Sequence, residues 1–338
     1  MRKTKRYSVL TMTTRVAAGF VLAAVSAGAI AAAPIWKPEK AVELIAPSAA
    51  GGGTDLTART IQKILQEKRL VDVPTAVVNK TGGGGTVALA YLSQHAGNGH
   101  YLAIVPQLIV TNYIAGKSSF NYADFTPLAQ LTSEYVAFAV KADSPIRTAR
   151  DLLAQLKTDP GSISIAVGTS LGGANHIAAV LATRAAGGDA QKLKTVVFKS
   201  SAESITALLG GHVEMVSSSV SLFGPQLKAG TLRLLAISAP RRSEGVLAAV
   251  PTWKEFGHNI VVDNWRALFG PPKMGQAQID YWDEVTGRLS QMDEWKKDVK
   301  NNLWENNYMG SKESRKYLDS EYEELRRVLS DLGMAKKN

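Results

Sequence analysis

The sequence predicts an α/β protein in which two sheets, each mostly parallel, are flanked by helices. Strand-like and helix-like segments alternate along most of the chain, as expected when helices connect parallel strands. The chain has 338 residues, of which 45% are hydrophobic. That is enough for one large or two medium domains, and the lengths between turn clusters favour two sheets.

The alternation begins at Val42–Ala46, an apolar run that predicts a strand. Residues Asp55–Lys68 predict a helix, because Ile61, Ile64 and Leu65 recur on one helical face. The same reasoning predicts a strand at Thr75–Val78, a helix through Ala88–Gln94 and a strand at Tyr101–Val105.

The second half of the alternation predicts strands at Ser162–Val167, Thr195–Phe198, Val213–Ser217 and Leu232–Ser238, and helices at Ala174–Ala186 and Ala202–Leu209. We expect the chain to cross between the sheets at Tyr135–Lys141 and Val261–Phe269, which precede the turns Ser144-Pro145 and Pro271-Pro272. Two crossings make the first lobe discontinuous, with residues 34–138 and about 265–338, and assign 139–264 to the second lobe.

The C-terminal region, about 311–332, predicts one amphipathic helix that Gly333 ends. Leucine and tyrosine side chains recur there at spacings of 4, 3, 4 and 3, at Leu318, Tyr322, Leu325, Leu329 and Leu332. We expect this face to pack on the protein's own core, and a coiled-coil seam is the alternative.

The N-terminus predicts a secretory signal peptide over residues 1–33. Five basic residues precede a small, apolar run at Val16–Gly28, and an A-x-A pattern then allows cleavage after Ala31 or Ala33. A single membrane anchor is the alternative, but the apolar run is short for a bilayer. We therefore expect an exported, periplasmic protein.

Charge and cysteine content exclude several partners. The leader holds five basic and no acidic residues, so the mature chain has 34 basic against 29 acidic residues, a net charge of +5. The basic residues are scattered, without the basic stripe interleaved with aromatics that nucleic-acid binding needs, so no nucleic-acid partner is expected. The chain has no cysteine, so disulfides and thiolate metal sites are excluded.

Two glycine clusters, Gly51–Gly53 and Gly82–Gly85, each lie between a predicted strand and a predicted helix. The carboxyl ends of parallel strands meet at one edge of a sheet, where open α/β folds bind ligands. A helix N-terminus presents free N–H groups and a partial positive charge, and glycine lets the backbone approach a ligand. Together the two loops predict an anion site built without Arg or Lys, and the alternative is that the glycines only form tight turns.

Nucleotide binding is excluded by the spacing of the glycines. The dinucleotide fingerprint would need a third glycine at Leu56 or at Val87. Gly116-Lys117-Ser118 resembles the end of a P-loop, but the first glycine of that motif would fall at Thr111.

A serine hydrolase is the competing function. Gly168-Thr169-Ser170-Leu171-Gly172 matches G-x-S-x-G between a strand and a helix, and Asp189 followed by His212 or His258 keeps the order of a triad. No oxyanion segment of the HGGG type is visible, so we favour a third strand-to-helix loop whose hydroxyls donate hydrogen bonds.

Metal and cofactor sites are not expected. The five histidines show no metal-ligand spacing. His176 follows the Ser170 loop, and two interpretations stay open: it reaches the ligand, or it is a packed or solvated histidine.

The two loops resemble a known family. Pro47–Arg59, with G-G-G-T-D and A-R, resembles the first loop of the Bug receptors, the periplasmic solute-binding proteins of tripartite tricarboxylate transporters. Asn79–Gly85 is similar to that family's N-x-P-G-A-G-G. Further blocks follow in the family's order at Leu208–Val213, Ala229–Ala236, Arg241-Arg242, Val250–Gly257 and Trp265 before Pro271-Pro272.

The resemblance implies a two-lobed periplasmic-binding fold of type II-like organisation, which closes on a carboxylate-bearing solute and delivers it to small and large membrane subunits. Family receptors hold the carboxylate with the two glycine loops, through backbone N–H groups and ordered waters. By position, the first lobe would contribute Pro47, Ala50, Gly51, Gly52, Gly53, Thr54, Asp55, Asn79, Gly82, Gly83, Gly84, Gly85 and Thr86. The second lobe would contribute Thr169, Ser170, Gly173, His176, Ser200 and Ser201.

Departures from the family pattern bear on the ligand. Thr81 and Gly83 replace the usual proline and alanine, so the second loop should be more pliable. Phe198–Ser201 lacks the common Tyr-x-Gly-Gly pattern, and its hydroxyls and Lys199 would suit a polar di- or tricarboxylate such as citrate. Asp55 lies beside an anion site, where it would either orient the first helical turn or select a ligand that also carries an amino group.

We therefore expect a non-enzymatic receptor for a small organic acid. A sensor that reports its ligand to a membrane kinase, rather than to a permease, would share the same site.

Overall fold

The computed structural model describes residues 1, 36–168, 170–198 and 200–336. The predicted signal peptide lies outside these residues except for Met1, and Thr169 and Lys199 also lie outside them. Residues from Trp36 onward form one of the two units into which the chain divides, and this unit is described below.

The first sheet has six strands in the order β11-β4-β10-β3-β1-β2. They span Val42–Ala46 (β1), Thr75–Asn79 (β2), Tyr101–Pro106 (β3), Thr126–Ser133 (β4), Arg266–Gly270 (β10) and Glu305–Gly310 (β11). Strand β1 pairs in parallel with β2 and β3, whereas β10 pairs antiparallel with β3 and β4. The start of β10 therefore lies at the edge where the parallel strands end.

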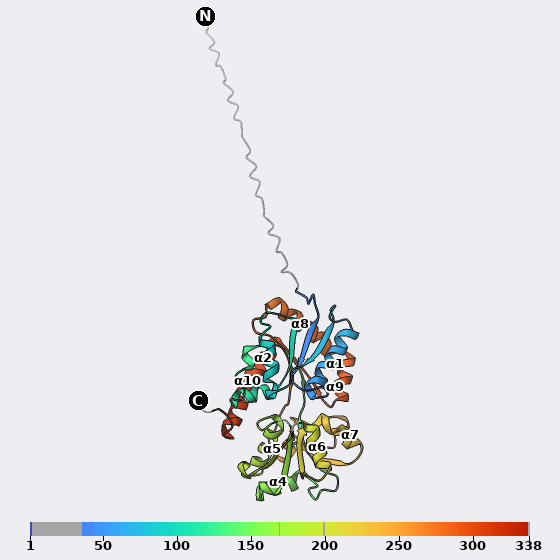
Figure 1. Cartoon of the computed structure of the whole chain (residues 1–338), viewed down its shortest axis with the longest axis vertical. Coiled ribbons are helices and arrows are strands. Elements are labelled where there is room, and N and C mark those ends of the chain that lie inside the picture. Colours follow the sequence, from blue (N-terminus) through green and yellow to red (C-terminus); the bar gives the residue numbers. More distant parts are fainter. Residues whose placement is uncertain (2–35, 169, 199, 337–338) are drawn as a thin grey trace. The chain divides into compact units, whose positions relative to one another are not determined.

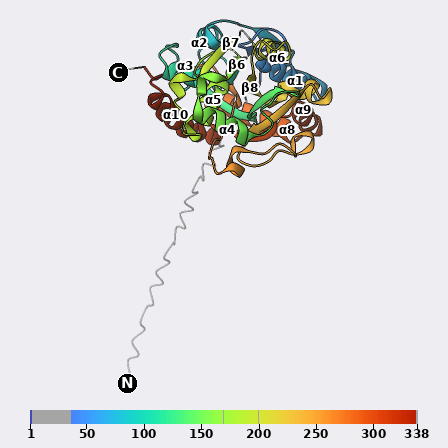
Figure 2. The ribbon, with the colours of Figure 1, turned by 90° about the horizontal axis from the view of Figure 1, so that it is seen from below.

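Helices cover both faces of the first sheet. They span Gly53–Glu67 (α1), Thr86–Ser93 (α2), Leu108–Ile114 (α3), Gln276–Gln291 (α8), Asp293–Asn301 (α9) and Ser311–Asp331 (α10). Figure 2 shows α1, α8 and α9 on one side, and α2, α3 and α10 on the other, and Figure 1 agrees for α1 and α9 against α2 and α10. The buried apolar residues divide in the same way, because Ile64 and Trp282 share one cluster while Leu92 and Leu329 belong to another.

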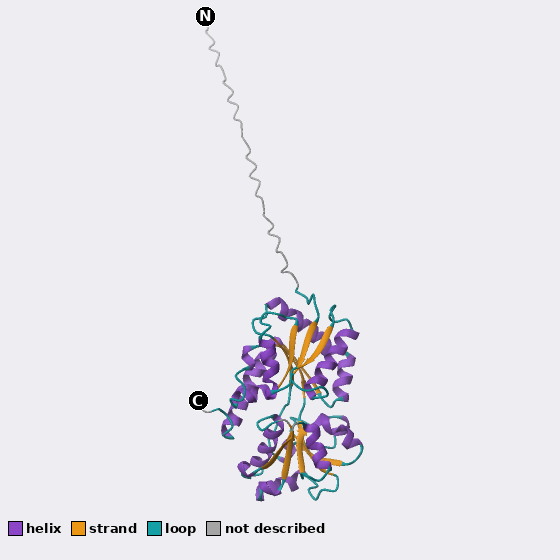
Figure 3. Ribbon diagram, viewed as in Figure 1, coloured by secondary structure: helices purple, strands orange, loops and turns teal. Residues whose placement is uncertain are grey.

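The second sheet has five strands in the order β7-β6-β8-β5-β9. They span Val136–Lys141 (β5), Ser164–Gly168 (β6), Lys194–Phe198 (β7), Met215–Ser219 (β8) and Leu232–Ile237 (β9). Helices at Ala149–Thr158 (α4), Ala174–Ala185 (α5), Ser201–Leu209 (α6) and Gly224–Lys228 (α7) accompany these strands (Figure 3).

Two neighbouring segments connect the sheets. The chain leaves the first sheet between β4 and β5, and it returns between β9 and β10. The segments pair at an antiparallel bridge between Tyr135 and Asp263, and the N–H of Asn264 donates to the Glu134 carbonyl at 2.8 Å.

The predicted α/β class with two helix-flanked sheets is confirmed, but each sheet is mixed rather than mostly parallel. The second sheet is parallel across β7, β6 and β8 and antiparallel across β8, β5 and β9. The crossings explain the difference. A strand that directly follows a crossing, such as β5 or β10, has no helical connection within its new sheet that would make it parallel to its neighbours.

The predicted tail helix is confirmed, and it packs on the protein's own core. Leu318, Leu325 and Leu329 of α10 are buried in the cluster that also contains strand residues of the first sheet. Gly333 has φ +67°, a left-handed conformation that suits glycine and ends the helix.

In the part of the chain that the structure describes, no helix is both long enough and apolar enough to cross a bilayer.

We expect Leu329→Ala to lower the free energy of unfolding by about 2–5 kcal/mol, because Leu329 is fully buried and alanine leaves a cavity. Urea unfolding followed by circular dichroism measures the loss. The neighbouring Ser330 is exposed, so Ser330→Ala should change stability by less than about 0.5 kcal/mol. Equal effects of the two substitutions would show that α10 does not form part of the core.

Candidate functional site

The first glycine loop connects β1 to α1 through a tight turn. Gly51 has φ +80°, and the N–H of Gly52 donates to the Ala49 carbonyl at 3.0 Å. A Cβ on Gly52 would lie 2.6 Å from Ser48 Oγ, so a side chain at this position would collide with Ser48. Glycine is therefore required at Gly51 by conformation and at Gly52 by space.

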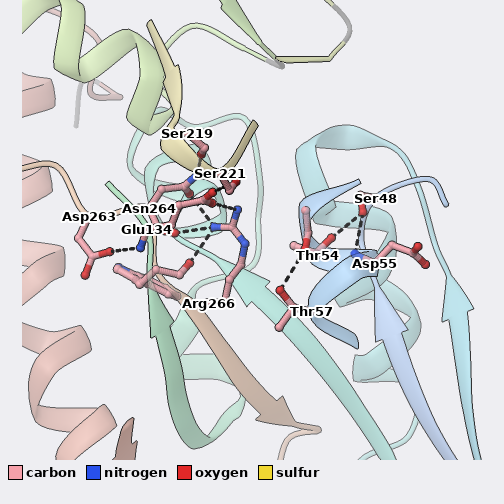
Figure 4. Close-up of polar contacts among 12 residues, drawn as sticks. Ser48, Thr54, Asp55, Thr57, Glu134, Ser219, Ser221, Asp263, Asn264 and Arg266 are labelled. Atoms are coloured by element: carbon pink, nitrogen blue, oxygen red, sulfur yellow. Dashed lines mark hydrogen bonds and ion pairs between the residues drawn. The ribbon is translucent and has the colours of Figure 1, made fainter. Parts of the chain in front are cut away.

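Ser48 caps helix α1 from within this loop. Its Oγ accepts hydrogen bonds from Thr54 Oγ1 at 2.7 Å and from the N–H of Asp55 at 3.2 Å (Figure 4). Among the described residues, no acceptor is assigned to the N–H groups of Gly53 and Thr54. Gly53 is exposed and Thr54 is buried, so the Gly53 N–H lies at the surface, at the positive end of a 15-residue helix that favours an anion.

Asp55 organises the loop. Its side chain is 1% exposed, and its Oδ2 accepts from the N–H of Gly51 at 2.9 Å and from Arg59 Nε at 2.9 Å. Its Oδ1 accepts from Asn79 Nδ2 at 2.8 Å, and the same amide donates to the Ser48 carbonyl. The structure therefore favours the orienting role of Asp55 over that of a ligand selector, because its oxygens bind protein donors.

These bonds also set the protonation state of Asp55. Burial alone would raise the pKa of this carboxyl, but hydrogen bonds from Arg59, Asn79 and Gly51 outweigh burial and lower its pKa below the ordinary value of 3.8. Asp55 is thus an anion at neutral pH.

The second glycine loop has an unusual backbone. Gly82, Gly83, Gly84 and Gly85 all have positive φ, of 120°, 56°, 61° and 101°. A Cβ on Gly84 would lie 2.4 Å from Nδ2 of the buried Asn112, which donates to the Gly84 carbonyl at 3.1 Å. Only a run of glycines can have positive φ at four successive residues at little conformational cost.

The two glycine loops are neighbours. Strands β1 and β2 pair in parallel, and Ala46 is opposite Asn79 at their carboxyl ends. A Cβ on Gly85 would lie 3.6 Å from Pro47 Cβ, so the second loop packs against the start of the first. The structure therefore brings the predicted first-lobe residues together at one sheet edge, where α1 and α2 begin.

The predicted second-sheet residues also share one edge. Gly168 ends β6 opposite Phe198 at the end of β7, and a Cβ on Gly168 would lie 2.4 Å from Ser201 Oγ. Ser200 caps α6 by accepting from the N–H of Glu203 at 3.2 Å. Ser170 Oγ is buried without a hydrogen-bond partner among the described residues. Thr169 lies outside the described residues, so its position stays a prediction.

The Ser170 loop reaches the first sheet. A Cβ on Gly173 would lie 3.4 Å from Leu108 Cδ1 at the start of α3, and Lys117 Nζ donates to the Leu171 carbonyl at 2.9 Å. Helix α3 also carries Asn112, which holds the second glycine loop. The loops of the two sheets are thus linked through α3.

His176 is a packed residue of helix α5. It is 8% exposed, and its Nδ1 accepts a hydrogen bond from the N–H of Gly172 at 3.2 Å. Burial, with a smaller contribution from the charge of Lys117, lowers the pKa of His176 to about 4. The histidine is therefore neutral at physiological pH and holds the loop that precedes α5.

The arrangement does not support the serine hydrolase. Ser170 Oγ has no partner among the described residues, and His176 uses Nδ1 for Gly172. Asp189 accepts from the N–H of Gln191 instead of orienting a histidine, while His212 is exposed and His258 is half-buried. The G-x-S-x-G match belongs to a strand-to-helix loop with no assembled triad. Among the residues described, no group of three or more His, Asp or Glu side chains could hold a metal ion.

Arg266 is the site residue that sequence reasoning missed. It opens β10, and the antiparallel direction of β10 places it opposite Pro106, at the edge where β3 ends. It is 7% exposed and pairs with Glu134, at 3.1 Å between Nη2 and Oε2 (Figure 4). A Cβ on Gly53 would lie 3.1 Å from Arg266 Nη2, so the guanidinium adjoins the start of α1. The available signal was one charged residue within the apolar run Trp265–Gly270.

Solved structures share this fold. The structure of Rpa4515 from R. palustris with adipate has a TM-score of 0.79 and 22% identity, covering 88% of this chain and 99% of that one. MatC from Rhodopseudomonas palustris with bound malate has a TM-score of 0.71 and 20% identity, covering 86% and 99%. This chain therefore has the two-lobed fold of these proteins, with two helix-flanked mixed sheets joined by two crossings.

The family follows from the sequence comparisons. Residues 57–334 match the model of TctC, the tripartite tricarboxylate transporter family receptor, and the chain belongs to this family. The protein BugT of Bordetella pertussis is 25% identical over 239 residues, which cover 69% of this chain and 71% of BugT. The resemblance to the Bug receptors is confirmed.

Asp55→Asn should destabilise the protein at neutral pH, because an amide cannot accept from both Gly51 and Arg59 while also receiving the Asn79 amide. A carboxyl whose pKa is lowered by folding stabilises the fold above its unfolded pKa, and this stabilisation is lost as the pH falls through the folded value. The difference in melting temperature between wild type and variant should therefore be largest near neutral pH and shrink below pH 3.8. Thermal unfolding across this range measures it, and a pH-independent difference would contradict the assigned hydrogen bonds.

Gly84→Ala should destabilise the second loop by more than conformational strain alone. A left-handed alanine costs about 1–2 kcal/mol, and at Gly84 it also collides with Asn112. Gly211, with φ +75° and open space around it, provides the matched control in Gly211→Ala. Chemical unfolding should show a larger loss for Gly84→Ala, and equal losses would mean that Asn112 moves aside without cost.

Proposed function

We propose that this chain is an exported receptor that captures a small organic acid at the two glycine loops and delivers it to a membrane transporter. The observation that carries the proposal is the convergence of both loops, and of the N-termini of α1 and α2, at the carboxyl ends of β1 and β2. In a chain of the receptor family, an edge rich in free N–H groups is best suited to a carboxylate.

The ligand is proposed to contact backbone groups more than side chains. Ala50 to Thr54 and Gly82 to Thr86 would surround one carboxylate, and the N–H groups of Gly53 and Thr54 have no acceptor among the described residues. Pro47, Asp55 and Asn79 would shape the loops. Hydrogen bonds to a charged group contribute roughly 1.5–3 kcal/mol each, so four or five could support binding of about −8 kcal/mol after the cost of association.

The second sheet would hold the distal end of the ligand. Its proposed contacts are Thr169, Ser170, Gly173, His176, Ser200 and Ser201. Ser170 offers a hydroxyl without an assigned partner among the described residues. A di- or tricarboxylate fits this polar wall, and the two similar solved structures described above were determined with the dicarboxylates adipate and malate.

The remaining assignments rest on the family and on the sequence. The partners would be the small and large membrane subunits of a tripartite tricarboxylate transporter, and the receptor would act in the periplasm without enzymatic activity or cofactor. Cleavage after Ala31 or Ala33 would release the mature chain. The lobes would comprise residues 34–138 with about 265–338, and 139–264.

Ligand-dependent thermal stabilisation tests the proposal. A ligand at 100 times its dissociation constant should add about 2.7 kcal/mol to the free energy of unfolding. The screen uses adipate, malate, succinate and citrate, with the corresponding neutral amides as matched controls, and isothermal titration calorimetry confirms each hit. At least one acid should stabilise the purified mature chain. Stabilisation by none of them, or equally by acids and amides, would contradict a carboxylate receptor.

A further inference from the structure

We propose that Arg266 is a specificity-determining residue that binds one ligand carboxylate in bidentate fashion at the start of α1. This inference rests on the proposed function, because it assigns a charged side chain to a site otherwise built from backbone. It predicts a receptor that selects an ionised carboxylate over a neutral group of the same shape.

Several hydrogens of the Arg266 guanidinium already have acceptors in the protein. Its Nη1 donates to the Asn264 carbonyl at 2.6 Å, to Asn264 Oδ1 at 2.9 Å and to the Trp265 carbonyl at 3.2 Å. One Nη2 hydrogen goes to Glu134 Oε2 at 3.1 Å. Among the described residues, no acceptor is assigned to Nε, and the second Nη2 hydrogen is likewise unused. These two N–H groups form the edge of guanidinium that matches the two oxygens of a carboxylate.

The Nε–Nη2 edge of Arg266 lies next to Gly53, at the start of α1. An ideal Cβ on Gly53 would be 3.1 Å from Arg266 Nη2 and 4.0 Å from Nε. Gly53 is exposed, and within the described part of the chain its own N–H and that of Thr54 have no acceptor. The Nε–Nη2 edge and the first turn of α1 therefore offer four donors in one place, next to the partial positive charge of the helix.

Glu134 and Asn264 keep the guanidinium of Arg266 in position. Glu134, which is 3% exposed, accepts from Arg266 Nη2 and also from Ser221 Oγ, which lies just after strand β8 of the second sheet. Asn264 receives Arg266 Nη1 and donates from Nδ2 to Ser219 Oγ at 3.0 Å. Glu134 and Asn264 are positioning residues, and Ser219 and Ser221 tie them to the second sheet (Figure 4). A long side chain held in this way loses little freedom when it binds a ligand.

The Arg266–Glu134 pair balances the buried charge of the guanidinium and leaves donors for an anion. The Arg266–Glu134 pair has no net charge, so the buried cation is compensated without a ligand. An incoming carboxylate would then accept from Nε and from the Nη2 hydrogen that Glu134 does not accept. An uncharged amide offers one acceptor and two competing hydrogens at the same place, and is rejected for that reason.

Affinities of Arg266 variants for an acid and for its amide test this inference. Arg266→Gln should weaken binding of the dicarboxylate acids used above by about 10- to 100-fold, the equivalent of one or two charge-assisted hydrogen bonds. Binding of the amides should change little, so the preference for acid should fall. Arg266→Lys keeps the charge but lacks the bidentate edge, and should also lose affinity. The exposed Arg288 provides the control, since Arg288→Gln should bind like wild type.

Two further variants separate binding from folding. Arg266→Gln leaves Glu134 buried without its partner, whereas the double variant Arg266→Gln with Glu134→Gln removes both charges and should fold more stably than the single variant. It should still bind the acids weakly. Gly53→Ala would place a methyl group 3.1 Å from Arg266 Nη2, against the Nε–Nη2 edge, and should weaken acid binding. Urea unfolding of the variant without ligand checks that the fold is retained.

The outcomes are distinguishable. Acid affinity and acid preference unchanged in a folded Arg266→Gln or double variant would overturn the role of Arg266 while leaving the receptor function in place. Failure of the wild-type protein to bind any acid would overturn both. Equal losses for acids and amides would reduce Arg266 to a structural residue and would also overturn the inference.

Discussion

The carboxylate of Asp55 is the constraint on which the glycine-loop edge depends. Three donors converge on it from different parts of the chain: the loop backbone at Gly51, the end of β2 at Asn79, and the next turn of α1 at Arg59. These bonds hold the first loop against β2, together with the bond from Asn79 to the Ser48 carbonyl, and the second loop packs on the first at Pro47. A negative side chain thus helps to build a site for negative ligands, because donors of the protein itself occupy its oxygens.

The features that sequence predicted well are those with a local cause. Strand β1 and helix α5 are predicted by the apolar runs and the helical periodicity of their own residues. The glycine loops are predicted by the clustering of glycines, which few other structural elements need. The antiparallel strands were harder, because β10 and β11 join the first sheet through partners far away in sequence. The mixed character of both sheets could not be read from alternation alone.

The same distinction applies to the site. Asp55 could not be assigned from sequence because its partner Asn79 lies 24 residues away, and only the pairing of β1 with β2 brings them together. Arg266 was missed because, in a sheet assumed to be parallel, site residues are expected directly after the carboxyl end of each strand. An antiparallel neighbour contributes its first residue to that edge instead. His176 has a spacing that suits either a ligand or a packed residue, and burial favours packing.

The two crossings have a consequence for how the chain folds. Strands β3 and β10 pair through residues 106 and 266, so the first sheet closes a very long loop and would have to overcome its entropy directly. All strands of the second sheet lie within that loop, and its outermost members in sequence, β5 and β9, are neighbours. Formation of the second sheet therefore brings the ends of the loop together, where the N–H of Asn264 donates to the Glu134 carbonyl. The inserted second sheet therefore shortens the loop that the pairing of β3 with β10 has to close, and this lowers the entropic cost of completing the sheet that carries the glycine loops.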